Sequence, residues 1–343
     1  MKQLAVVICT YNRPDQLPAA LAATQAQTAH RDLDVVVVDD GSAPPVDEAM
    51  VTATGARLVR HERNLGLGRA RNTGIEATDA PLVAFTDDDC RPCPEWAEAL
   101  VDAYGTGDWA AVGGPVEVQG HDGLLARYYL ECPPVVPLEA ALGRSRSIAY
   151  RAWLYAKGNV FPPRPQGTRT VFSLAGANMS FRREALAAVG GFDPGIRFGG
   201  DDEEICQRLR QRFGAACLVV TPAAAVMHDY DLTVLDLVRR AFRYGAGNAR
   251  NVARHDEWKP TLFPVPLVAL LLLGLARARP RAALAAAAVP VVMAPRWPVL
   301  ALRARQLEPL VYAYLQALQE TASNAGYLYA AAFSSRKARS NVP

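Results

Sequence analysis

The chain has 343 residues, of which 50% are hydrophobic, so it can bury a large core in one domain or two. Its net charge of +3 is too small to indicate a nucleic-acid-binding protein. The six cysteines are scattered, and the single CxxC pair of Cys90 and Cys93 has no second pair, which argues against a structural zinc site. We expect reduced cysteines and a cytoplasmic protein, because the chain runs directly into an apolar strand without a visible secretion signal.

The first third of the chain alternates between short apolar runs and segments with helical spacing. Runs rich in β-branched residues predict buried strands, and strands that alternate with helices predict a parallel sheet covered on both faces. The predicted strands are 4–9, 34–38, 56–60 and 82–86, and the predicted helices are 15–26 and 69–77. The fold class is therefore α/β, with a Rossmann-like, mostly parallel sheet.

Polar clusters follow three of the predicted strands, at residues 10–13, at Asp39 and Asp40, and at residues 87–89. Ligands of such sheets bind at the carboxyl ends of the strands, so we expect the three clusters to converge on one crevice. Asp87 and Asp89 are two positions apart and point to the same side of an extended backbone. They could hold one divalent ion, Mn²⁺ or Mg²⁺, which prefers oxygen ligands, although a solvated acidic loop is the alternative.

After residue 110 we predict strands over 110–118 and 172–181 and a helix over 202–213. The last third differs, with a basic amphipathic helix over 232–254 and apolar runs over 267–276 and 282–294, between which lie Arg277, Arg279 and Arg281. Each run is shorter than the ~20 residues that cross a bilayer as a helix. Three interpretations stay open: an interfacial or re-entrant membrane anchor, a helical pair in the interface of a homo-oligomer, or an ordinary helical subdomain.

Seven short motifs, in this order, make the chain resemble the family 2 glycosyltransferases. They are TYNR at 10–13, VDDGS at 38–42, NLGLGRARNTG at 64–74, TDDD at 86–89, GANMSFRR at 176–183, GGFD at 190–193 and GDDEEICQRL at 200–209. The resemblance spans about residues 3 to 255 and implies a GT-A fold. It implies a catalytic domain over 1–230, in which 1–110 binds the nucleotide sugar and 111–230 binds the acceptor, followed by a helical region over 231–343.

The resemblance also implies an inverting transferase that moves one sugar from a nucleotide diphosphate sugar to a hydroxyl acceptor. A divalent ion on Asp87 and Asp89 would neutralise the leaving diphosphate. The implied nucleotide-binding residues are Thr10, Tyr11, Arg13, Asp40, Arg71 and Asp88, of which Asp40 would accept a hydrogen bond from the nucleobase. Arg71 would reach the base or the diphosphate, or would instead pair with an acid on a helix surface.

The acceptor side is implied by the second group of motifs. The family pattern places the catalytic base on Asp202, with Asp201 as the alternative, and one of the two acids can cap the helix. His228 would complete the ion's coordination, unless it is structural. Asn178 and Arg182 would hold the transferred sugar or the acceptor, or would only fix the fold.

Other classes fit the sequence less well. A sugar-phosphate nucleotidyltransferase would carry a glycine-rich loop after the first strand, where this chain has residues 10–13. A non-catalytic nucleotide-binding scaffold would have lost the acids that are present here, and a processive synthase would carry a Gln-x-x-Arg-Trp motif. UDP or dTDP is the favoured donor nucleotide, because both bases present an N3–H donor to Asp40, and GDP is less favoured. The basic and apolar C-terminal third suggests a lipid-linked or membrane-proximal acceptor at the inner face of the cell membrane.

Overall fold

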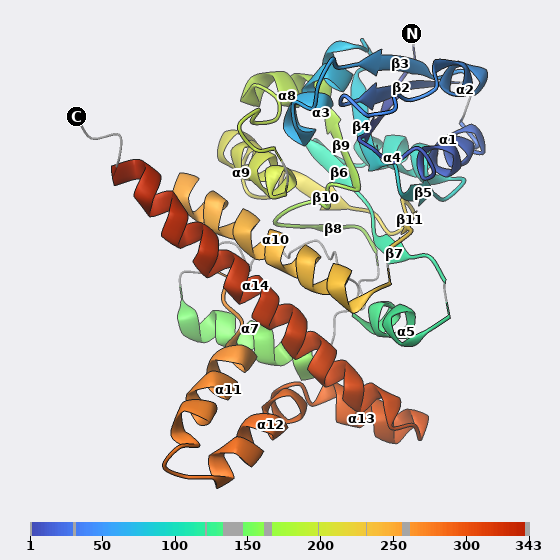
Figure 1. The fold of residues 1–343 in the computed structure, drawn as a ribbon. Coiled ribbons are helices and arrows are strands. Elements are labelled where there is room, and N and C mark those ends of the chain that lie inside the picture. Colours follow the sequence, from blue (N-terminus) through green and yellow to red (C-terminus); the bar gives the residue numbers. More distant parts are fainter. Residues whose placement is uncertain are drawn as a thin grey trace. The chain divides into compact units, whose positions relative to one another are not determined.

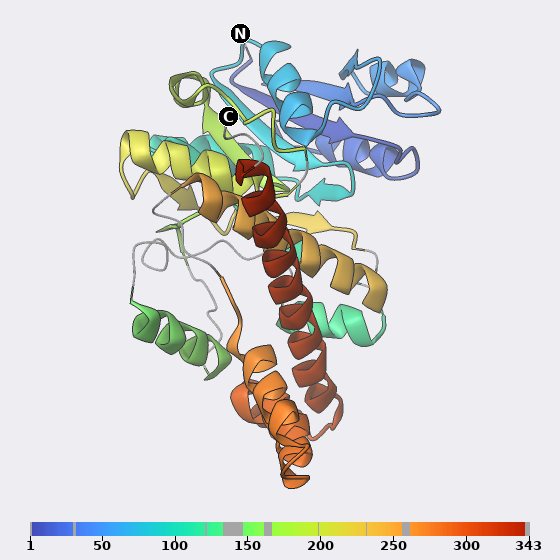
Figure 2. The same ribbon diagram turned by 60° about the vertical axis from the view of Figure 1, so that its left-hand side comes forward.

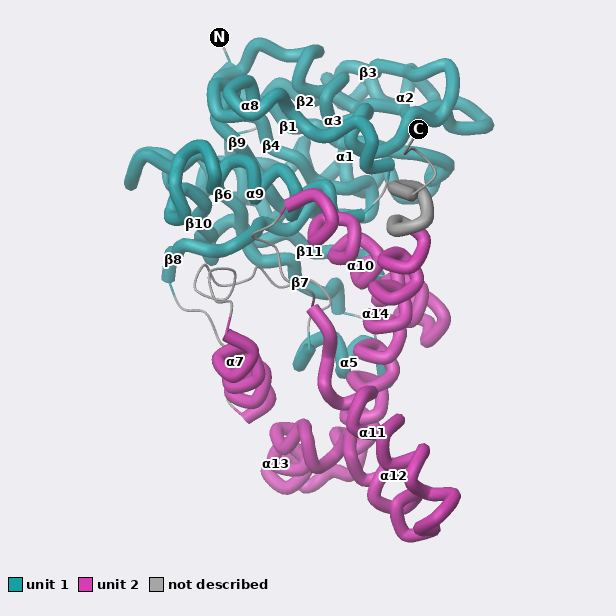
Figure 3. The backbone as a smooth tube through the Cα atoms, turned by 90° about the vertical axis from the view of Figure 1, so that its left-hand side faces the viewer, with its two compact units in different colours: residues 1–141, 165–230 teal, residues 142–164, 231–343 magenta. Residues whose placement is uncertain are grey.

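The computed structural model describes residues 2–29, 32–120, 122–132, 147–160, 167–197, 199–230, 232–255 and 261–339. The chain divides into two compact units, which Figure 3 shows in different colours. The first unit comprises residues 1–141 and 165–230, and the second comprises residues 142–164 and 231–343.

An eight-stranded sheet forms the centre of the first unit (Figure 1). At its middle, β1 (Leu4–Thr10) lies between β2 (Leu33–Asp39) and β4 (Leu82–Asp87) and is parallel to both. The sheet continues with β3 (Arg57–Arg60) beyond β2, and with β9 (Asn178–Arg182), β6 (Ala111–Gly113), β10 (Leu218–Val220) and β8 (Arg169–Thr170) beyond β4. Strand β9 is antiparallel to both of its neighbours. The sheet confirms the predicted α/β class.

Helices cover both faces of this sheet, because alternate side chains of each strand point to opposite faces. Along β1, Leu4, Val6 and Ile8 enter one core cluster, and Ala5 and Val7 enter the other. The first cluster includes side chains of α1 (Leu17–Gln25), α2 (Glu48–Ala53) and α4 (Trp96–Gly105). The second includes side chains of α3 (Leu67–Glu76), α8 (Arg183–Val189) and α9 (Asp201–Phe213).

Helix α3 approaches β1 closely through Gly74. A Cβ atom at this position would lie 2.2 Å from Cγ1 of Val7, so any larger residue would push the helix off the sheet. This contact explains the glycine that ends the motif at residues 64–74.

A smaller, three-stranded sheet has β11 (Val226–His228) between β5 (Cys90–Pro92) and β7 (Val116–Val118). Helix α5 (Leu124–Glu131) packs against β7. The single strand predicted over 110–118 is therefore wrong, because β6 and β7 belong to different sheets. Gly114 separates them, and a Cβ atom there would lie 1.6 Å from the carbonyl oxygen of Ala224.

The second unit is helical (Figure 2). Its elements are α7 (Ile148–Val160), α10 (Val234–Arg254), α11 (Pro264–Leu275), α12 (Arg281–Met293), α13 (Arg296–Ala304) and α14 (Glu308–Arg339). Among the helices that the structure describes, none is by itself long and apolar enough to cross a membrane. Within the described part of the chain, α12 and α13 taken together reach that length and composition, and they are bent by 71° at the break between them.

Candidate active site

The carboxyl ends of β1, β2 and β4 meet at one edge of the large sheet. In the register of these parallel strands, Thr10 lies beside Asp39 and Cys9 lies beside Asp87. The three polar clusters that follow the strands therefore lie together, at the edge where parallel α/β sheets bind their ligands.

Asp88 is the most buried member of the acidic triplet. Its carboxylate accepts hydrogen bonds from the Thr10 hydroxyl at 2.7 Å and from the Arg13 guanidinium at 3.2 Å. Arg13 also donates to Asp89 at 2.5 Å. Burial raises the pKa of Asp88 to about 6, although the nearby Arg13 opposes the shift. Three of the predicted nucleotide-binding residues are thus in direct contact, and Tyr11, which follows β1, is 46% exposed.

A cluster of potential metal ligands is formed by Asp87, Asp89, Cys90 and His228. Their ligand atoms all lie within 4.8 Å of one another. The pairing of β5 with β11 places His228 opposite Cys90, and the Nε2 atom of His228 is 3.5 Å from Oδ1 of Asp89. The imidazole also stacks on the ring of Tyr230, with 3.8 Å between the ring centroids.

The chemistry of this cluster suits a hard divalent ion. Burial raises the pKa of the Cys90 thiol well above its ordinary value, and a hard divalent ion prefers oxygen ligands to sulfur. Two carboxylates and one imidazole remain, a set that fits Mn²⁺ or Mg²⁺. Burial likewise raises the pKa of Asp87, with Asp89 adding to the shift and Arg71 opposing it.

Arg71 joins the acidic triplet to the acids of α9. Its guanidinium is 3% exposed, donates to Asp201 and to the carbonyl oxygen of Gly176 at 3.1 Å, and lies 3.6 Å from Oδ1 of Asp87. Burial alone would lower the pKa of Arg71, but the carboxylates of Asp201 and Asp87 raise it above its ordinary value. Arg71 is therefore a buried, charged bridge, and its predicted contact with the nucleotide stays a prediction.

Asp201 and Asp202 begin α9 but differ in their surroundings. Asp201 pairs with Arg71, whereas the Asp202 carboxylate accepts hydrogen bonds from the backbone N–H groups of Gly176 and Glu203, each at 2.9 Å. Burial raises the pKa of Asp202 to about 6, and the neighbouring Asp201 adds to the shift. A Cβ atom on Gly176 would lie 3.2 Å from Oδ2 of Asp202 and 3.0 Å from Nη2 of Arg71, so only glycine leaves both side chains undisturbed.

Asp40 is held from several sides at the same edge of the sheet. Its carboxylate accepts hydrogen bonds from the N–H groups of Leu65 at 2.8 Å and Gly66 at 2.9 Å. It also lies 2.7 Å from Nδ1 of His61, whose Nε2 is 2.9 Å from the Thr73 hydroxyl. His61 belongs to none of the sequence motifs and was not predicted. It directly follows β3, and ligands of such sheets bind at the carboxyl ends of the strands, so its position was a usable signal.

For Asn178 and Arg182 the structure favours the alternative that they fix the fold over a role in holding the sugar or the acceptor. Asn178 is fully buried, accepts a hydrogen bond from the Trp96 indole N–H at 2.8 Å, and donates to the carbonyl oxygens of Pro115 and Ala224 at 2.9 and 2.8 Å. These bonds use its side-chain amide to fix the fold.

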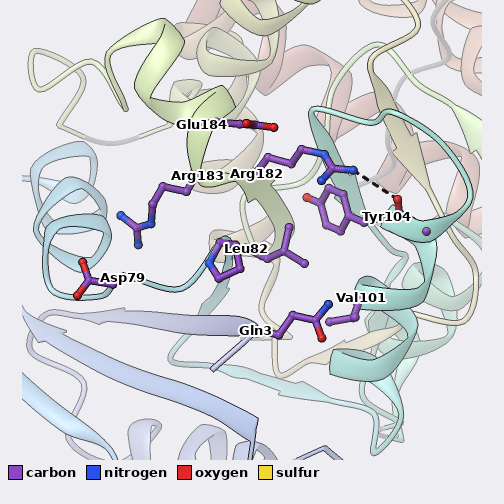
Figure 4. Close-up of a pocket in the computed structure, with 10 residues that line it drawn as sticks. Gln3, Asp79, Leu82, Val101, Tyr104, Arg182, Arg183 and Glu184 are labelled. Carbon is purple, nitrogen blue, oxygen red and sulfur yellow. Dashed lines mark hydrogen bonds between the residues drawn. The ribbon is translucent and has the colours of Figure 1, made fainter. Parts of the chain in front are cut away.

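Arg182 lies at the other edge of the sheet. Because β9 is antiparallel to β4, Arg182 pairs with Leu82 at the start of β4 and not with the acidic triplet at its end. Its guanidinium donates to the carbonyl oxygens of Trp109 at 3.0 Å and Tyr104 at 3.4 Å. It lines a pocket of about 790 Å³ together with Gln3 and Leu82 (Figure 4).

Comparisons with known proteins show the family of the chain. The sequence model described as glycosyl transferase family 2 matches residues 5–190, and the one described as glycosyl transferase family group 2 matches residues 152–302. The chain is 31% identical over 234 residues to the pre-mycofactocin glycosyltransferase of Mycobacterium tuberculosis, in an alignment that covers 67% of this chain. The aligned region spans only 44% of that relative's length.

Two further relatives cover more of their own length. The chain is 27% identical over 259 residues to the glucosyl-dolichyl phosphate glucuronosyltransferase of Haloferax volcanii, covering 71% of this chain and 75% of the relative. Among solved structures, a mannosyltransferase of Pyrobaculum calidifontis in complex with GDP-Man and Mn²⁺ superimposes with a TM-score of 0.57. That superposition covers 95% of this chain and 87% of the other at 20% identity, and this likeness of fold confirms the predicted GT-A architecture.

Proposed function

Since the chain belongs to glycosyl transferase family 2, we propose that it is a metal-dependent, inverting glycosyltransferase. It moves a single sugar from a nucleotide diphosphate sugar, with UDP or dTDP as the favoured nucleotide, to a hydroxyl acceptor. The observation that carries the proposal is the buried Arg71 bridge, which joins Asp87 of the metal-ligand cluster to Asp201, the neighbour of Asp202. A single side chain therefore links the donor-binding acids to the acids that would activate the acceptor.

The donor side would use the cluster of Asp87, Asp89 and His228 to hold Mn²⁺ or Mg²⁺. A bound ion supplies Lewis-acid neutralisation of the charge on the leaving diphosphate. Asp88, together with Thr10 and Arg13 that both donate to it, would orient the nucleotide beside that cluster. The complex of the Pyrobaculum relative with GDP-Man and Mn²⁺ supports this combination of ligands.

The acceptor side would use Asp202 as the general base. Its carboxylate takes the proton of the acceptor hydroxyl while the acceptor oxygen forms a bond to the anomeric carbon. The bond from that carbon to the diphosphate breaks, and its electron pair leaves with the nucleoside diphosphate, so the configuration inverts. Asp202 suits the role better than Asp201, because its pKa is raised to about 6 and its partners are neutral N–H groups, whereas Asp201 is paired with Arg71.

The acceptor would be a lipid-linked or cell-envelope glycan. Two observations support this class: the likeness to the Haloferax glucosyl-dolichyl phosphate glucuronosyltransferase, and the arginine-rich, apolar second unit of this chain. We propose that the protein meets such an acceptor at the inner face of the cell membrane.

Calorimetry with UDP, dTDP and GDP, each with and without Mn²⁺, tests the proposal. We expect one nucleotide to bind only with Mn²⁺, and this binding to be lost in Asp89→Asn. The matched control is Asp102→Asn, which changes an exposed acid on α4 and leaves binding intact. If no nucleotide binds under either condition, the transferase assignment fails. If a nucleotide binds but no sugar is transferred to any hydroxyl acceptor, a non-catalytic nucleotide-binding scaffold is favoured.

A further inference from the structure

The second unit carries a stretch of unusual composition, residues 262–307, which contains α11, α12 and α13. This stretch has no aspartate, glutamate, lysine or histidine, and its only charged residues are arginines. They are Arg277, Arg279, Arg281, Arg296, Arg303 and Arg305. The exposed helices of a water-soluble domain mix both signs of charge, so a purely cationic and apolar stretch points to an anionic partner.

Several apolar side chains of this stretch are exposed on neighbouring helices. On α11 the exposed fractions are 64% for Leu270 and 66% for Leu271, and only Val265 and Pro266 are buried. On α12, Leu284 is 75% exposed. Exposed apolar side chains gathered on two packed helices are typical of an interaction site.

Helices α11 and α12 form a hairpin whose base is fixed and whose tip is free of the rest of the unit. At the base, the Asn324 side chain accepts a hydrogen bond from Phe263 N–H at 2.8 Å and donates to the Phe263 carbonyl oxygen at 2.9 Å. Figures 1 and 3 both show the hairpin extending away from α14. Arg277, Arg279 and Arg281 lie at the tip, and all three are exposed.

We propose that the α11–α12 hairpin binds the surface of an anionic lipid bilayer, lying in the interface with its leucines among the acyl chains. A helix of 12 residues is about 18 Å long, whereas the hydrocarbon core is about 30 Å thick, so α11 cannot span it. Insertion tip first would bury three arginines in hydrocarbon, which is strongly unfavourable. In a hairpin that lies along the surface, the exposed tip arginines would reach lipid phosphates.

Flotation of the full-length protein with vesicles tests this inference without any sugar donor, so its outcome is separate from that of the transferase proposal. We expect binding to vesicles of equal parts phosphatidylcholine and phosphatidylglycerol, and much weaker binding to phosphatidylcholine alone. Leu270→Glu is expected to lower partitioning by at least about tenfold, because a charge replaces an inserted side chain. Arg279→Glu is expected to lower it roughly tenfold on the mixed vesicles, because an attractive charge becomes repulsive.

Matched controls distinguish binding through the hairpin from nonspecific binding of the protein to vesicles. Leu130→Glu changes a leucine of the first unit that is 61% exposed, and Arg239→Glu reverses an exposed arginine of α10, so neither should change partitioning. Thermal unfolding verifies that all variants fold, which is expected because each changed side chain is exposed. Binding to neither vesicle, or an equal loss in the controls, overturns the inference. Self-association that Leu270→Glu abolishes, without vesicle binding, also overturns it and assigns the hairpin to an interface between two copies of the chain.

Discussion

Asp202 differs from Asp201 in its partners, which are two backbone N–H groups in place of a guanidinium, and this difference has a measurable consequence. A general base must be ionised, and burial raises the pKa of Asp202 to about 6. We therefore expect kcat/KM for sugar transfer to fall as the pH drops through about 6, because the protonated carboxyl group cannot accept the proton of the acceptor hydroxyl.

Variants identify the residue whose protonation causes this fall in kcat/KM at low pH, the acid limb of the pH profile. Asp202→Asn should lower kcat by about 10² to 10⁴ and remove the limb while nucleotide affinity in calorimetry is kept. Glu203→Gln, the matched change on the next, half-buried acid, should leave the limb in place. A pH profile of the wild-type enzyme without an acid limb near this value, or a limb that survives in Asp202→Asn, would show that another group is the base.

Some site residues could be predicted from the sequence pattern and others could not. The acidic triplet at residues 87–89 could be predicted, because an apolar strand that ends in like charges needs a cationic ligand or solvent. For Asn178 and Arg182, the spacing of residues in the sequence could not decide between binding the sugar or acceptor and fixing the fold. Their strand, β9, is antiparallel to β4. Asn178 is therefore buried beside Thr86 at the end of β4, and Arg182 lies beside Leu82 at its start. Strand direction depends on the whole connection between two strands, and a motif does not contain that information.

At the scale of elements, the crossing of α10 and α14 depends on two glycines. A Cβ atom on Gly245 would lie 1.9 Å from the carbonyl oxygen of Ser323, and one on Gly326 would lie 2.0 Å from that of Phe242. Both obstacles are backbone atoms, which cannot rotate away, so the helices would have to separate. We expect Gly245→Ala or Gly326→Ala to destabilise the protein by about 1 to 3 kcal/mol or more, measured by thermal unfolding.

Gly274 on α11 provides the matched control, because a Cβ atom there would meet nothing within 4 Å. Gly274→Ala should leave stability unchanged or raise it by up to about 1 kcal/mol, through the better helix propensity of alanine. Equal effects of the three substitutions would mean that propensity and not backbone contact dominates at the crossing.

Elements were predictable where the hydrophobic period was unambiguous. The strands expected over 4–9, 34–38 and 82–86 correspond to β1, β2 and β4. The strand expected over 172–181 was too long, since β9 begins only at Asn178. Phe172 and Leu174 are nevertheless buried, so burial produced an apolar pattern without a strand.

At the scale of the whole molecule, contacts between distant segments decide which residues form a unit. Helix α7 belongs to the second unit, although it precedes the last strands of the first. Within that unit the Tyr155 hydroxyl donates to the Glu320 carboxylate at 2.9 Å, and the Gln316 amide donates to Asn159 at 3.0 Å. Polar pairs so far apart in the sequence have no local signature, which explains why the sequence alone did not assign residues 148–160 to this unit.

The division into two units also predicts how metal binding affects unfolding. The metal-ligand cluster is built by residues of the first unit only, and a ligand that binds only the folded state stabilises it. Free Mn²⁺ at ~100 times its dissociation constant should stabilise the protein by ~2.7 kcal/mol, seen by calorimetry as a higher unfolding temperature than in EDTA. Asp89→Asn should lose this shift. Gly326→Ala, which alters only residues of the second unit, should unfold at a lower temperature yet keep the shift, and a shift that persists in Asp89→Asn would place the ion elsewhere.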